Sequence, residues 1–143
     1  MDYETVHDGR IVLCGITARV RNTEPAKIGE LWNRFYAEPF VDRLAIEDGA
    51  VYCAYFDYES DHTGSYTALL GFRVTDGQPA PDGLTLLTIN PATYAMLRRS
   101  GPMPVTVVEA WQQVWDSDLP RTYIADFDRY ASPDTVEVNV GIA

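Results

Sequence analysis

The stretch YCAYFD at residues 52–57 returns in altered form as YIADFD at residues 123–128. An amphipathic segment precedes each copy, with ELW at residues 30–32 and EAW at residues 109–111. Because the residue types and their order both agree, the sequence predicts a structural duplication.

Each copy is predicted to contain a strand, a helix and two further strands. The strands are expected at residues 11–20, 51–60, 65–75, 84–90, 122–132 and 135–143, and the helices at 26–37 and 105–118. Residues 91–100 fit either a strand or a loop. The stretch DGQPAPDG at 76–83 reads as the internal linker, which places the repeats at about 10–76 and about 83–143 of a single domain, 1–143.

The predicted fold class is α+β. Neither half can bury a sheet face alone, so the strand-helix-strand-strand units are expected to pack about a pseudo-two-fold axis. The result is an antiparallel sheet with two main helices and a ligand groove between the halves. A chain of 143 residues with 46% apolar residues is long enough to bury one core.

The charge balance restricts the possible partners. Lys and Arg total 11 against 21 Asp and Glu, a formal net charge of −10. This balance disfavours nucleic acid and anionic membranes and permits a site for cations. Two cysteines, two histidines and no Cys/His cluster predict no disulfide framework, metal or cofactor. The N-terminus lacks a signal-peptide pattern, and no apolar run approaches membrane-spanning length, so a cytoplasmic location is expected.

Alternation along the two repeated strands separates apolar faces from mixed aromatic and acidic faces. The apolar faces are expected to lie under the helices. The mixed faces are expected to line a cleft, and their residues are Cys53, Tyr55, Asp57 and Glu59 in the first copy and Ile124, Asp126, Asp128 and Tyr130 in the second. Ring faces attract a cation by about 0.5–2 kcal/mol, and a partly buried carboxylate adds to this. The pattern therefore favours an organic cation as ligand.

Simpler interpretations stay open at this point. Alternating aromatic and acidic residues also occur on half-exposed strands whose outer face is solvated. Trp32, Trp111 and Trp115 have the helical spacing of core residues. His62 is expected in a solvated loop, and Gly71 is expected to be a turn-type glycine of the predicted hairpin. No catalytic motif such as GxSxG, HExxH or a P-loop is present.

The order of these segments resembles the GyrI-like effector-binding domain, and within it the stand-alone integron-cassette effector-binding proteins. The resemblance rests on YFDYESDHTGSYTALLGFRV at 55–74, the helix EAWQQVW at 109–115, the strand PRTYIADFDRY at 120–130 and VEVNVGI at 136–142. It covers residues 10–143.

This resemblance implies a groove between pseudo-symmetric halves that takes lipophilic cationic drugs or dyes. The acidic residue of the family's F-[acid]-x-Tyr strand motif corresponds to Asp128, where relatives more often have Glu. We expect Asp128 to be the counter-ion, with Glu109 and Glu59 as further candidate acids. The complete set of candidate ligand-binding residues is Asp128, Glu109, Glu59, Tyr55, Tyr66, Trp111, Tyr130 and Asp126.

Three functions remain in competition. The first is a small-molecule binding protein that senses or sequesters amphipathic, cationic compounds. The second is a GyrI-like hydrolase that opens cyclopropane rings, and the third is an acidic inhibitor of a DNA enzyme such as gyrase. Exposed sheet edges permit a monomer or a homodimer. The sequence shows no helix-turn-helix, so DNA binding would require a partner protein.

Overall fold

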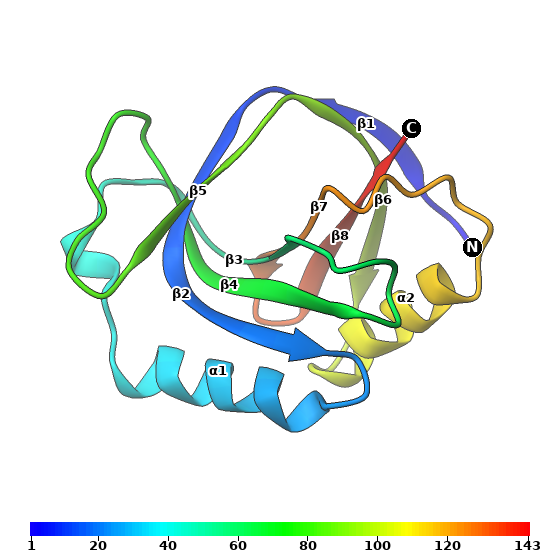
Figure 1. Cartoon of the computed structure of the whole chain (residues 1–143), viewed down its shortest axis with the longest axis horizontal. Coiled ribbons are helices and arrows are strands. Elements are labelled where there is room, and N and C mark those ends of the chain that lie inside the picture. Colours follow the sequence, from blue (N-terminus) through cyan, green and yellow to red (C-terminus); the bar gives the residue numbers. More distant parts are fainter.

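Eight strands form one curled antiparallel sheet in the computed structural model, which describes residues 1–143 (Figure 1). The strands are β1 (Glu4–Asp8), β2 (Ile11–Arg21), β3 (Ile46–Phe56), β4 (Ser65–Val74), β5 (Thr85–Ile89), β6 (Ala92–Ser100), β7 (Ala125–Ser132) and β8 (Thr135–Ile142). Two helices, α1 (Pro25–Ala37) and α2 (Val105–Trp115), and a 3₁₀ turn, η1 (Val41–Arg43), complete the fold.

The strand order confirms the predicted duplication of elements and the α+β class. The order is β1-β6-β8-β7-β3-β4-β2-β5, so β3 and β7 pair at the centre. On one side of this pair follow β4 and β2, and on the other side follow their counterparts β8 and β6. The helix α1 packs on β2 and β4, and α2 packs on β6 and β8. The two halves therefore repeat one arrangement around the central strand pair.

The two outermost strands connect the halves. The strand β1 precedes β2 in the chain but pairs with β6, whereas β5 precedes β6 and pairs with β2. The undecided residues 91–100 form β6, with Arg98 and Arg99 at its solvated end. No strand was predicted over β1, because its residues, ETVHD, are mostly exposed and carry no apolar alternation.

A pair of glycines brings β2 and β4 close together. Gly15 and Gly71 are direct neighbours across the ladder. A Cβ on Gly71 would lie 2.0 Å from the carbonyl oxygen of Cys14, and one on Gly15 would lie 2.1 Å from that of Leu70. Gly71 is therefore not a hairpin residue as predicted, but an interior residue of β4 whose missing side chain permits the close approach.

The apolar faces of the repeated strands point away from the helices, which corrects the sequence-based expectation. Tyr52 and Ala54 of β3 and Phe127 of β7 belong to a core on the side of the sheet without helices. The curl of the sheet lets β2, β5 and β6 close over this face, since Ile11, Leu13, Ile89 and Tyr94 share the core. The sheet thus buries its apolar face against itself and leaves the mixed face for the helices.

Each helix contributes a separate core on the mixed face. The helix α1 begins with Pro25, whose fixed φ suits a first turn, and it buries Leu31 and Phe35. The helix α2 ends at Trp115, three residues before the predicted end. Its buried residues are Val107, Ala110, Trp111 and Val114. Because each helix covers its own half, the sheet between them is uncovered at β3 and β7.

Ring contacts fix which residues of the two halves are equivalent. Trp32 of α1 packs edge-on against Tyr130 at 5.3 Å, and Trp111 of α2 packs edge-on against Tyr55 at 5.4 Å. Tyr55 therefore corresponds to Tyr130. The YCAYFD/YIADFD match instead equates Tyr55 with Asp126, which lies four positions before Tyr130. The match misaligns the strands because β7 begins only at Ala125.

Candidate functional site

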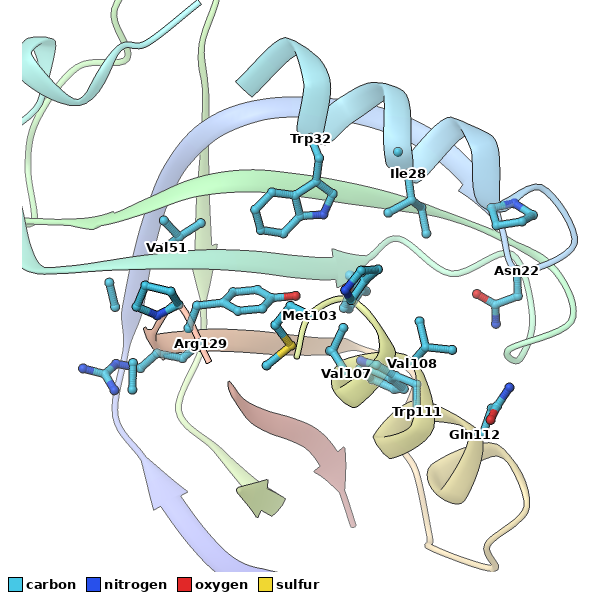
Figure 2. Close-up of a pocket in the computed structure, with 18 of the residues that line it drawn as sticks. Asn22, Ile28, Trp32, Val51, Met103, Val107, Val108, Trp111, Gln112 and Arg129 are labelled. Carbon is cyan, nitrogen blue, oxygen red and sulfur yellow. The ribbon is translucent and has the colours of Figure 1, made fainter. Parts of the chain in front are cut away.

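A pocket of about 1250 Å³ lies between α1 and α2 over the centre of the sheet (Figure 2). Figure 2 shows Trp32 and Ile28 of α1 on one side and Val107, Val108 and Trp111 of α2 on the other. The pocket exists because the two helices cover the outer strands of their halves and leave the central pair open. A ligand groove between the halves was the expectation from the sequence.

Eight tyrosine and tryptophan rings line the pocket. Four of the predicted residues, Tyr55, Tyr66, Trp111 and Tyr130, line it. Four further aromatic residues line it that the prediction did not include, namely Trp32, Tyr36, Tyr58 and Trp115. Most of these rings meet edge to face, so each is held by a neighbouring ring and the wall is formed without a ligand.

Asp128 lies directly beneath this wall. Its side chain is completely buried. Its Oδ2 accepts a hydrogen bond from the Tyr55 hydroxyl at 2.6 Å, and its Oδ1 accepts one from Trp111 Nε1 at 2.9 Å. Both donors line the pocket and Asp128 itself does not. The carboxyl group therefore acts on the pocket through two rings that are polarised by hydrogen bonds.

The protonation state of the Asp128 side chain depends on pH near neutrality. Burial raises the pKa of Asp128 to about 7, and the nearby Asp126 carboxylate also raises it. The hydrogen bonds from Tyr55 and Trp111 oppose this shift because they stabilise the charged form. Near neutral pH the group is thus partly ionised, and a cation in the pocket favours the ionised form.

Asp126 is also buried but is already paired within the protein. Its Oδ2 accepts from Arg121 Nη2 at 2.8 Å and from the Tyr58 hydroxyl, and its Oδ1 accepts from the backbone N–H of Gly141 at 2.7 Å. The Arg121 guanidinium neutralises this carboxylate. Of the two buried acids on β7, only Asp128 has no cationic partner in the protein.

The two remaining predicted acids lie outside the pocket wall. Glu59 is exposed and accepts a hydrogen bond from Arg21 at 3.4 Å. Glu109 is exposed on α2. Ile124, expected in the cleft, is 73% exposed before the start of β7. Asp57 is exposed as well and lies near Arg19, because β3 ends at Phe56.

Three further residues that were not predicted as site residues line the pocket. Simple alternation along the predicted strand at 51–60 puts Tyr58 on the apolar face with Tyr52, but Asp57 has a φ of 55° and turns the chain, so Tyr58 faces Asp126. His62 was expected in a solvated loop, but its ring stacks on that of Trp115, with 6.2 Å between the two ring centres. Arg121 comes from the segment between α2 and β7, where no periodicity indicates the direction of a side chain.

The end of the pocket near the β7–β8 turn carries a compensated charge network. Arg129 Nε donates to Asp48 at 3.2 Å, and Arg129 Nη1 donates to Glu137 at 3.1 Å. Although Arg129 follows Asp128 in the sequence, its side chain is on the opposite face of β7. Its charge is balanced by these two carboxylates and not by Asp128.

Two further properties concern the whole chain. No helix has both the length and the apolar composition that crossing a bilayer requires. The structure contains no group of three or more His, Cys, Asp and Glu side chains arranged to hold a metal ion.

A family model described as integron-associated effector-binding protein matches residues 8–139. The chain is also 28% identical over 142 residues to the putative transcriptional regulator protein YobU of Bacillus subtilis, with 90% of this chain and 89% of that protein covered.

Solved structures share the fold. An integron cassette protein from the mobile metagenome of Vibrio cholerae superposes with a TM-score of 0.84 and 27% identity, covering 99% of this chain and 95% of its own. The protein SAV2435, solved bound to tetraphenylphosphonium, superposes with a TM-score of 0.81 and 18% identity, covering 100% of this chain and 94% of its own. At this lower identity the second structure shows the fold alone.

Proposed function

This chain belongs to the integron-associated effector-binding protein family, and from that premise we propose that its pocket binds lipophilic organic cations. The observation that carries the proposal is Asp128, a buried carboxyl group without a cationic partner beneath an aromatic wall. Such a group attracts a cation strongly, because the surrounding protein screens charge less than water does.

The dimensions and composition of the pocket support this proposal. A volume of about 1250 Å³ accommodates a ligand of several rings. Trp111, Tyr55 and Tyr130 offer ring surface to an apolar cation, and each ring face also attracts its charge. Ring surfaces impose no fixed hydrogen-bond geometry, so ligands of different shapes can share the site.

The relatives provide independent support for a ligand of this class. The family description names effector binding, and SAV2435, which has the same fold, was solved with tetraphenylphosphonium, a lipophilic cation. The protein would act as a sensor or as a sequestering module. The hydrolase and the gyrase inhibitor stay predictions, because no observation on the pocket bears on turnover or on a protein partner.

The test is a titration with tetramethylrosamine, a fluorescent dye with one delocalised positive charge, followed by fluorescence anisotropy. We expect saturable binding, competition by tetraphenylphosphonium and at least tenfold weaker binding by Asp128→Asn, which loses the charge but keeps the shape. Asp118→Asn is the matched control, since Asp118 is exposed and does not line the pocket. Equal affinity of wild type and Asp128→Asn would remove Asp128 from the role.

A further inference from the structure

One end of the pocket is lined by two residues with buried nitrogen atoms that have no hydrogen-bond partner within the protein. This end is bounded by Asn22, His62, Gln112 and Arg121, and Figure 2 shows Asn22 and Gln112 together there. The Arg121 side chain is only 5% exposed although it lines the pocket. Its Nη2 donates to Asp126, but its Nε and Nη1 are buried and have no hydrogen-bond partner.

Aromatic rings surround the unpaired part of this guanidinium. Its central carbon lies 4.3 Å from the centre of the Tyr123 ring, 5.6 Å from that of Trp111 and 5.9 Å from that of Tyr58. These rings stabilise the positive charge. A ring face is a weaker acceptor than an oxygen atom, so the N–H groups of Nε and Nη1 lose their hydrogen bonds to water without full replacement.

His62 provides a second unsatisfied group at the same end. Its Nδ1 is buried without a hydrogen-bond partner. The ring stacks on Trp115 with an interplanar angle of 10°, and Asn22 Nδ2 donates to the His62 carbonyl oxygen at 2.8 Å. Trp115 lies one helical turn after Trp111, which Arg121 contacts. Both unsatisfied groups therefore adjoin the same ring-bearing face of α2.

We propose that this end of the pocket is an acceptor subsite, which binds a carbonyl or carboxylate oxygen of the same ligand whose cation lies over Tyr55 and Trp111. The inference rests on the proposed function and narrows its ligand class. Asp126, which anchors Arg121, is two residues before Asp128 on the same face of β7, a separation of roughly 7 Å. The preferred ligand thus carries both a positive charge and an oxygen acceptor.

Three dyes with the same tetramethylxanthylium cation test this subsite. Tetramethylrosamine has an unsubstituted pendant ring, the methyl ester of tetramethylrhodamine adds a neutral carbonyl, and tetramethylrhodamine carries a carboxylate. We expect the wild type to bind the ester more tightly than the rosamine, and the carboxylate about tenfold more tightly, because charge-assisted hydrogen bonds are the stronger ones. The ratio of the affinities reports on the subsite, because all three dyes share the cation.

Two variants locate the effect. Arg121→Gln should reduce the ratio of the affinity for the carboxylate dye to the affinity for the rosamine to near one. His62→Phe, which keeps the stacking on Trp115, should reduce the same ratio by about threefold. Arg10→Gln is the matched control, since Arg10 forms an exposed ion pair with Asp76. Should Arg121→Gln fail to fold, as judged by circular dichroism, His62→Phe decides the question.

The outcomes separate the two proposals. Rosamine binding that depends on Asp128, together with equal affinities for all three dyes, would overturn the acceptor subsite and leave the cation site standing. The acceptor subsite is also overturned if the wild type prefers the carboxylate dye to the rosamine and neither variant changes this preference, because the preference then arises elsewhere in the protein. If none of the dyes binds, both proposals fail. A ratio that falls in both variants and not in Arg10→Gln supports the subsite.

Discussion

Trp111 Nε1 donates a hydrogen bond of 2.9 Å to the completely buried Asp128 Oδ1, although the two residues come from different elements, α2 and β7. This bond joins the pocket wall to the charge beneath it. A ligand that packs on the Trp111 ring is within reach of the field of the carboxylate without touching it. The protonation of Asp128 is therefore expected to control both binding and stability.

Cation binding should strengthen with rising pH. The pKa of Asp128 is raised by burial to about 7, so at pH 6 about a tenth of the molecules carry the charge and at pH 8 about nine tenths do. If the ionised form binds, affinity for tetraphenylphosphonium rises roughly tenfold between these values. Isothermal titration calorimetry at several pH values measures this rise.

The control for this experiment is Asp128→Asn. The other residues that line the pocket, His62 among them, are the same in both proteins. The asparagine variant keeps His62 and removes only the titration of Asp128. A variant that retains the full tenfold rise would contradict the assignment to Asp128.

The stability of the protein should respond to pH in the opposite sense. Because the pKa of Asp128 is raised from 3.8 to about 7 by folding, the folded protein binds an additional proton between these values. The corresponding stabilisation is complete below the unfolded pKa and is lost as pH rises through the folded one. Asp128→Asn does not titrate, so its free energy of unfolding should gain about 2–3 kcal/mol relative to wild type between pH 5 and pH 7.5.

Urea unfolding of both proteins at these two pH values measures that gain. Only the change in the difference between the proteins is used, because all other titrating groups are common to both. Asp118→Asn, which replaces an exposed acid, is the control substitution. A constant difference between wild type and Asp128→Asn would mean that Asp128 has the same pKa in the folded and unfolded chain.

The sequence predicted most elements and the two-fold arrangement, because strand and helix periodicities are local properties. It located both helices and the strands corresponding to β2, β4, β5 and β8 to within a few residues. It assigned the wrong face of β3 and β7 to the helices. The curl of the sheet, which closes β2, β5 and β6 over the apolar face, depends on contacts between distant residues, and alternation along a single strand cannot indicate it.

The candidate site was predicted in part for the same reason. Tyr55 and Tyr130 followed from strand alternation, and Asp128 from the resemblance. The exposed Glu59 and Glu109 show that acidic character alone does not indicate burial. Arg121 could not be found, because it comes from an irregular segment and its direction depends on its ion pair with Asp126.

Gly71→Ala should destabilise the fold strongly. Its Cβ would lie 2.0 Å from the carbonyl oxygen of Cys14, a backbone atom that cannot rotate away, so β2 and β4 must separate. We expect a loss of about 3 kcal/mol or more in the free energy of unfolding, measured with urea. Gly29→Ala in α1 is the control, since its Cβ meets nothing within 4 Å and alanine favours a helix by up to about 1 kcal/mol. Equal stability of both variants would contradict the close approach of the strands.

The equivalent tryptophans of the two halves offer a matched pair of substitutions. Trp111→Phe and Trp32→Phe each leave a ring to pack on Tyr55 or Tyr130, but only Trp111 donates to Asp128. Without this donor the pKa of Asp128 should rise further, because the bond favours the ionised form. The midpoint of the pH dependence of tetraphenylphosphonium binding should therefore move upward by about one pH unit in Trp111→Phe, equivalent to a hydrogen bond of about 1.4 kcal/mol.

In Trp32→Phe the affinity can fall, since ring surface is lost, but the midpoint should not move. Equal midpoints in the two variants would show that the hydrogen bond from Trp111 does not set the charge beneath the pocket.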